Sequence, residues 1–88
     1  MAEWNNIRHQ RLAKYTMSIT VSLTGVEAHT IRRYEIAGLV RPRRTGAGQR
    51  IYSDSEIGMI REISRLCGKG INLEGIKAIM ALRRGQQI

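Results

Sequence analysis

The chain has 88 residues, of which 42% are hydrophobic, so it suffices for one small folded domain and is too apolar to be disordered throughout. Fifteen lysines and arginines oppose seven acidic residues, for a formal net charge of +8 at neutral pH. Such a surplus attracts polyanions: nucleic acid, an anionic membrane surface or an acidic protein. The single cysteine, Cys67, excludes an intrachain disulfide and a metal site built from several thiolates.

The same composition bounds the compartment. No apolar run approaches the length of a membrane-spanning helix, and no signal peptide is recognisable. The cytoplasm is the expected location.

In chain order, the first predicted unit is an arm, residues 1–16. Glu3 to Lys14 can form a short helix with Trp4 and Ile7 along one side, although a helix of this length requires tertiary support. The folded domain is expected over 17–84, and a tail over 85–88.

The domain opens with two short predicted helices. Ser18 is a candidate N-cap for a helix from Ile19 to about Thr24, and Gly25 interrupts it. A second helix is predicted from Ala28 to Ala37, with Ile31 and Tyr34 on its inner face, and ends at Gly38. Two short helices joined by a tight, glycine-containing turn form a helix-turn-helix.

A wing is predicted next. Leu39–Pro42 and Arg50–Tyr52 have strand-like character, and a glycine-rich tip lies between them. Pro42 cannot donate to a central ladder, so a short edge hairpin is expected.

Two further helices complete the prediction. Ser53 and Glu56 fit a capping box, and the helix behind them carries an apolar stripe of Ile57, Ile60, Ile63 and Cys67. Gly68–Gly70 ends that helix, and Asn72 can cap a last helix that stops before Gly85. Ile71 and Leu73 flank the connecting loop and are expected to close the core. The predicted fold is mainly α, with about four helices, an N-terminal arm and a small β-hairpin wing.

Arginine is concentrated where a duplex reader needs it. Six arginines oppose only Glu35 between Ala28 and Tyr52, and the arginine fork suits phosphates and guanine edges. Glu35 is itself expected to pair with a nearby arginine. The cations and polar groups that we expect to face DNA are His29, Thr30, Arg32 and Arg33 on the second helix, Arg43, Arg44, Gln49 and Arg50 on the wing, and Lys69 in the last loop.

Several blocks of this sequence resemble the DNA-binding domain of the MerR family. They are Leu23-Thr24-Gly25-Val26, Thr30-Ile31-Arg32-Arg33-Tyr34-Glu35, Gly38-Leu39, Arg50-Ile51-Tyr52-Ser53, and Gly70-Ile71-Asn72-Leu73-Glu74-Gly75-Ile76-Lys77. The resemblance covers residues 17–82, and the last block is similar to the heat-shock repressors and the glutamine-responsive nitrogen repressors of that family.

The resemblance implies a bacterial transcriptional regulator, a repressor, that binds an inverted-repeat operator in double-stranded DNA as a homodimer. Such a regulator is expected in the bacterial cytoplasm, associated with the nucleoid. It implies a recognition helix, about 28–37, in the major groove, and wings at 41–50 and 68–72 on the backbone. Ser18, Tyr34 and Tyr52 join the expected contacts, each tyrosine being either a buried ring whose hydroxyl reaches a phosphate or a pure packing residue. Family members usually continue into a dimerising helix and an effector domain, so this chain is an excised domain or a short member that dimerises through Trp4 and Ile7.

Functions other than transcriptional regulation are also compatible with parts of this sequence. An excisionase-like DNA-bending protein shares the fold and is the main alternative; binding of RNA or of a membrane surface by charge alone, and docking of a partner protein or effector outside the DNA-binding core, are others. No pair of carboxylates or nucleophile and base suggests an enzyme, and no spacing of His and Cys suggests a metal or cofactor. Cys67, on the apolar stripe, is expected to pack in the core.

Overall fold

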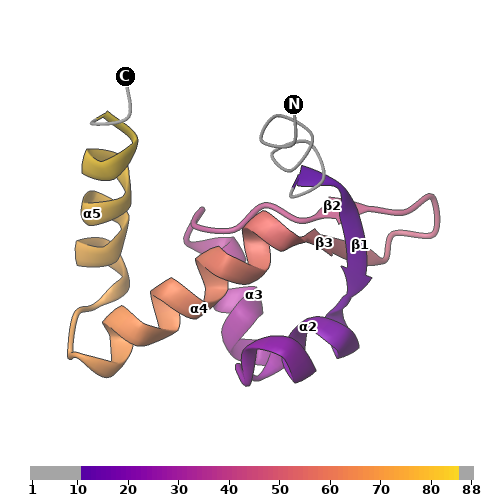
Figure 1. Cartoon of the computed structure of the whole chain (residues 1–88), viewed down its shortest axis with the longest axis horizontal. Helices are drawn as coiled ribbons and strands as arrows, with labels where there is room; N and C mark the ends of the chain where they lie inside the picture. The colour runs from indigo at the N-terminus through magenta and orange to yellow at the C-terminus, as the bar shows by residue number, and fades with distance from the viewer. Residues whose placement is uncertain (1–10, 86–88) are drawn as a thin grey trace, which may run out of the picture.

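The computed structural model describes residues 11–85, which form a mainly helical domain with a small antiparallel sheet (Figure 1). Its elements in chain order are β1 (Ala13–Thr16), α2 (Met17–Thr24), α3 (Ala28–Ile36), β2 (Arg43–Arg44), β3 (Arg50–Ser53), α4 (Asp54–Gly68) and α5 (Leu73–Gly85). The predicted class, four helices with a β-hairpin wing, is confirmed over this part of the chain. Trp4 and Ile7, and any helix near them, lie outside the described residues.

The sheet has one strand more than the sequence predicted. Residues 13–16, assigned to the arm, form β1, which pairs antiparallel with β3 and places Tyr15 opposite Tyr52. The strand order is β1-β3-β2, so β3 is central and β2 lies at the edge. Because β1 belongs to the sheet, the boundary between arm and domain at residue 16 is wrong, and the predicted helix cannot extend to Lys14.

The strand β1 runs directly into α2, and this shifts the helix start. Thr16, with extended backbone, is the N-cap, and its Oγ1 accepts from the Ile19 amide at 3.3 Å. Ser18 is therefore not the N-cap; it lies exposed in the first turn. A hydroxyl two residues earlier takes the capping position because the pairing of β1 with β3 holds Thr16 extended up to that point.

The first strand of the wing is also displaced. The sequence placed it at Leu39–Pro42, whereas β2 holds only Arg43 and Arg44. Leu39 and Val40 are buried in the core instead. An apolar pair such as Leu39 and Val40 after a helix is compatible with either a strand or a loop that fills the core. Here both residues are buried in the core, and the segment is a loop.

The core lies between α4 and the other elements. The buried residues of α4 are Ile57, Ile60, Ile63 and Leu66, so Leu66 takes the innermost place on the last turn and Cys67 is half-buried at the margin of the core. Ile71 and Leu73 pack against this core as predicted. The capping box is confirmed, since Ser53 Oγ accepts from the Glu56 amide at 3.2 Å and Glu56 Oε1 accepts from the Ser53 amide at 2.9 Å.

Across residues 11–85, no helix combines the length and apolar character needed to cross a bilayer. Within the same range, no three metal-binding side chains of His, Cys, Asp or Glu gather in one place.

Candidate nucleic-acid interface

The turn between α2 and α3 is held by one threonine. Thr24 donates its hydroxyl to the Thr20 carbonyl at 2.8 Å and accepts from the Val26 amide at 3.1 Å. Gly25 ends α2 with a φ of 72°, in the left-handed region that favours glycine. These bonds set the direction in which α3 leaves the turn.

Helix α4 also contacts the end of α2, next to this turn. Arg61 donates to the Leu23 carbonyl, the last turn of α2, at 2.8 Å. The sequence analysis missed this contact, because nothing local links positions that are 38 residues apart. It satisfies a carbonyl that the end of α2 leaves without a helical partner.

Helix α3 has two distinct faces. Ile31 and Tyr34 are buried, as predicted, whereas His29, Arg32 and Arg33 are exposed. This division follows from helical spacing, because residues three apart share a face. Thr30 is half-buried between the faces. The exposed side of α3 therefore carries two guanidinium groups and an imidazole.

The N-terminus of α3 carries a carboxylate. Glu27 is the N-cap residue without a side-chain cap bond, and its Oε2 lies 3.2 Å from His29 Nδ1. A negative charge is favourable at this end of a helix. Glu27 and His29 are both well exposed, so the contact is readily exchanged for another partner.

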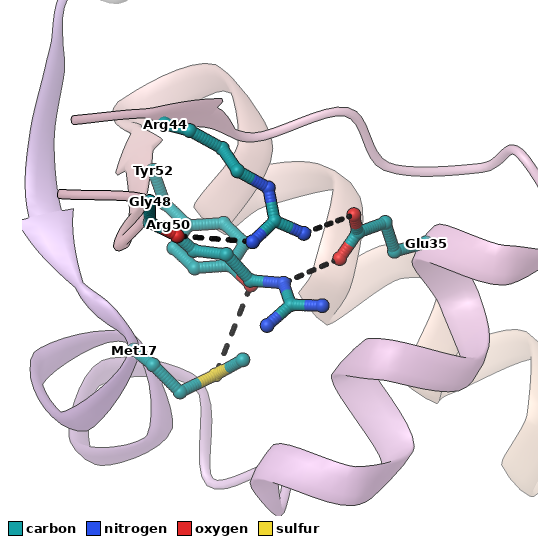
Figure 2. A network of polar contacts seen from close by, with 6 residues as sticks. All are labelled: Met17, Glu35, Arg44, Gly48, Arg50 and Tyr52. Atoms are coloured by element: carbon teal, nitrogen blue, oxygen red, sulfur yellow. Dashed lines mark hydrogen bonds and ion pairs between the residues drawn. The ribbon is translucent and has the colours of Figure 1, made fainter. Parts of the chain in front are cut away.

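Two arginines of the wing meet one carboxylate of α3 (Figure 2). Arg50 Nε donates to Glu35 Oε1 at 2.6 Å, and Arg44 donates to Glu35 Oε2 at a longer 3.4 Å. Arg44 also donates to the Gly48 carbonyl at 3.0 Å, within the hairpin. The predicted role of Glu35 as an arginine partner is confirmed, and the wing is joined to α3 through it.

The tip of the wing is closed by its own polar groups. The Thr45 amide donates to the Gln49 carbonyl at 2.8 Å, and Thr45 Oγ1 accepts from the Gln49 amide at 3.1 Å. Gly48 has a φ of 83°. The tip is therefore a defined turn, with the Gln49 side chain exposed.

Strand alternation separates the neighbouring arginines of the wing. Arg44 pairs with Arg50 across the sheet and shares its face, whereas Arg43 pairs with Ile51 on the opposite face. Arg43 lines a cleft there together with Arg11. Of the predicted wing cations, Arg44 and Arg50 lie with α3 and Arg43 does not.

The two tyrosines are core residues. Tyr52 is fully buried and its hydroxyl contacts Met17 Sδ at 3.8 Å, and this burial raises its pKa. Tyr34 is 4% exposed, burial raises its pKa, and its hydroxyl faces Cys67 of α4. Both rings are buried, as each of the two alternatives expected, and large aromatic side chains at these positions complete the core. A contact of their hydroxyls with DNA stays a prediction.

The loop between α4 and α5 presents Lys69, which is exposed. The chain turns at Gly70, whose φ is 88°. In Figure 1 this loop and the wing tip lie at opposite sides of the view, with α2 and α3 between them. The α4–α5 loop and the wing tip are thus on either side of the helix pair in this view.

Helix α2, a short turn and α3, followed by a hairpin attached to α3, define a winged helix-turn-helix domain. The chain belongs to the MerR HTH family of regulatory proteins, whose family model matches residues 15–82.

The chain is 41% identical over 69 residues to the putative heat shock protein HspR of Streptomyces coelicolor, covering 77% of this chain and 46% of that protein. It is 33% identical over 72 residues to the HTH-type transcriptional regulator GlnR of Bacillus anthracis, covering 82% and 56%. The chain thus spans about half the length of these relatives. Among solved structures, HiNmlR, a MerR family regulator lacking the sensor domain and bound to promoter DNA, is similar with a TM-score of 0.66 and 27% identity, covering 74% of this chain and 52% of that one.

Proposed function

We propose that this chain is the DNA-binding unit of a bacterial transcriptional regulator that recognises a defined operator sequence. The observation that carries the proposal is the joining of two basic elements by Glu35. The exposed face of α3 bears Arg32 and Arg33, and the wing that Glu35 attaches to α3 bears Arg44 and Arg50. Membership of the MerR family supports the same assignment.

In this proposal α3 enters the major groove, which admits one α-helix. Arg32 and Arg33 approach base edges there, because a guanidinium can donate two bonds to guanine. His29 and Thr30 lie on the first turn, close to the backbone at the groove edge. Because the two arginines have no ion-pair partner within residues 11–85, no carboxylate there has to release them.

The wing and the α4–α5 loop hold the flanking phosphates. Arg50 uses only its Nε for Glu35, which leaves its terminal nitrogens for a phosphate. Arg44, at 3.4 Å, can exchange its carboxylate for one. Gln49 in the wing and Lys69 in the α4–α5 loop add further phosphate contacts, and Ser18 adds one from α2. Such contacts set the register of the helix without reading sequence.

A homodimer on an inverted repeat, acting as a repressor, completes the proposal; the resemblance to repressor branches of the family supports it. The dimer contact is assigned to Trp4 and Ile7. Deletion of residues 2–10 leaves β1 in place, so it tests this contact separately from the fold. We expect a lower mass in sedimentation and weaker operator binding. An unchanged mass would remove the arm from the dimer.

Selection of bound sequences from random duplexes tests the proposal as a whole. The expected result is an inverted repeat whose half-sites lie about one or two helical turns apart, since dimer geometry sets that spacing. Repeating the selection with Arg32→Ala and Arg33→Ala together should lose the enriched sequence. Enrichment of nothing but bendable DNA, with a bend in circular-permutation gels, would favour an architectural protein instead.

A further inference from the structure

A second basic surface lies beside the C-terminal end of α3, on the face of the wing that carries Arg43. Two adjoining cavities of about 520 and 420 Å³ form one cleft between α5 and the segment that joins α3 to β2. The two cavities share Leu39, Arg41, Met59 and Arg84, which makes them continuous. Figure 1 shows α5 standing apart from the sheet, with α4 running between them.

Cations surround this cleft. They are Arg11, Arg41, Arg43, Lys77, Arg83 and Arg84. The one carboxylate among the lining residues is Glu56, and its Oε1 already accepts from the Ser53 amide at 2.9 Å and the Ser53 hydroxyl at 3.1 Å. The cations that line the cleft therefore outnumber its carboxylates, and the lining keeps a positive net charge.

Most of these cations are available to a ligand. Arg83 is held by Glu62 at 2.7 Å, whereas the other five form no ion pair with any residue from 11 to 85. Lys77 Nζ lies 3.8 Å from the position that a β-carbon would take at Gly38. The α5 side of the cleft thus closes toward the end of α3 and brings an ammonium group to its edge.

The interior of the cleft is apolar at three points: Leu39, Met59 and Met80. Met59 is 38% exposed, so its side chain is accessible to a ligand in the cleft. Methionine adapts its shape to different apolar partners. A ligand that fits must therefore combine anionic groups with apolar side chains.

We propose that this cleft binds an acidic amphipathic segment of a partner protein. Its carboxylates would pair with the surrounding cations while its apolar face lies on Leu39 and the two methionines. A duplex suits the cleft less well, because its surface offers phosphates but no apolar side chains for that interior. The lining of the cleft includes neither Arg32 nor Arg33 of the exposed face of α3, so both surfaces can be occupied together.

Charge argues against occupants from this chain itself. Residues 1–10 contain one glutamate and one arginine, and residues 86–88 carry no charged side chain. The same termini on a second copy offer no more acidic side chains than these. A separate, acidic protein segment matches the cleft better than any of these.

The test uses the whole chain and a fluorescein-labelled peptide of about 15 residues, roughly four helical turns, with leucines on one face and glutamates on the other. A scrambled peptide of the same composition is the control ligand. We expect saturable binding, visible in fluorescence anisotropy, for the ordered peptide only. In methyl NMR, Met59 and Met80 should shift on binding, whereas Met17, which contacts Tyr52 in the core, should not.

Two variants with the same loss of charge locate the site. Lys77→Gln with Arg84→Gln should weaken peptide binding about tenfold, the size expected for two lost charge contacts, and leave duplex binding within about twofold. Arg32→Gln with Arg33→Gln should leave peptide binding within about twofold. Circular dichroism confirms that each variant is folded.

If both variants lower the affinity for the peptide equally, the attraction is a general charge effect and the proposal is overturned. Equal affinity for the scrambled peptide, or Met59 and Met80 signals that do not shift, would overturn it as well. If duplex DNA displaces the peptide and the Lys77/Arg84 variant loses duplex affinity, the cleft belongs to the nucleic-acid surface and the proposal fails. Because peptide binding is read without DNA, this result is independent of whether the chain recognises an operator.

Discussion

Two carboxylates in this domain each hold two arginines, yet they differ in geometry. Glu62 accepts two bonds from Arg65 at 2.8 and 2.7 Å and one from Arg83 at 2.7 Å, which joins α4 to α5. Glu35 joins α3 to the wing with one short contact, 2.6 Å to Arg50, and one long contact, 3.4 Å to Arg44. The short contacts of Glu62 hold α4 and α5 together. The Glu35 cluster, in contrast, leaves guanidinium donors of its arginines free for another acceptor.

Both clusters consist of one carboxylate between two arginines, but they differ in how many guanidinium donors they leave unused. Bidentate pairing of Arg65 uses the planar fork fully, so little remains for another anion. Arg50 presents its edge through Nε alone, and its remaining nitrogens extend beyond Glu35 (Figure 2). The proposed function requires arginines that are held in place but keep free donors for a phosphate, and the Glu35 cluster has this arrangement.

The largest effect is expected on the exposed face of α3. Arg33→Ala should cost about 1–3 kcal/mol of operator binding and relax preference at one base position, as loss of a base contact does. Arg84→Ala, an equal change on α5, should leave operator affinity within about twofold, since sites that share no partners act independently. Anisotropy titrations on the selected operator and on single-base variants measure both. Equal losses on random DNA would move Arg33 to the backbone contacts.

The next effect distinguishes the two clusters directly. Arg50→Ala should reduce the slope of log affinity against log salt by about one, because one phosphate contact is lost. Arg65→Ala removes the same charge from the Glu62 cluster and should leave the slope unchanged. Titrations over a range of salt concentrations give both slopes. If the two variants behave alike, the proposed division between the clusters is incorrect.

A smaller effect is expected for the carboxylate of α3. Glu35→Gln should lower the ratio of operator to non-specific affinity about threefold, of the order of one weakened ion pair. The wing is then less firmly held to α3, while the lost negative charge strengthens attraction to any duplex. Glu74→Gln, with the same charge change on α5, is the control. A uniform gain on all duplexes would mean that Glu35 acts by charge alone.

The smallest effect concerns stability and its dependence on pH. The guanidinium groups of Arg65 and Arg83 lower the pKa of Glu62 from its ordinary 4.5 to about 2. A carboxylate with a lowered folded pKa stabilises the fold fully above its unfolded pKa, and this contribution is lost as the pH falls through the folded value. Glu62→Gln should thus lower the melting temperature by a few degrees at neutral pH, and the difference from wild type should shrink between pH 4.5 and pH 2. Melting curves across this range measure it, and a difference independent of pH would contradict the ion-pair origin.

Much of the domain follows from local sequence. Gly25 after a short helical segment predicts the turn, Ser53 with Glu56 predicts the capping box, and the spacing of Ile31 and Tyr34 predicts the buried face of α3. Each of these signals acts over about one helical turn. Glu35 as the only carboxylate among six arginines predicts its pairing with arginine. These features depend on neighbours within a few positions and are therefore legible in the chain itself.

Tertiary structure decided the rest. Pairing of β1 with β3 joins Tyr15 to Tyr52 and moves the helix start to Thr16, and no local period encodes a partner that far away. Pairing of β2 with β3 determines that Arg44 shares a face with Arg50, whereas Arg43 lies on the other face. Burial of both tyrosines, and the contact of Glu62 with Arg83 across 21 positions, likewise arise only when distant segments pack together. Local conformational preferences determine where most helices and strands form, but packing into a common core determines which of them contact one another.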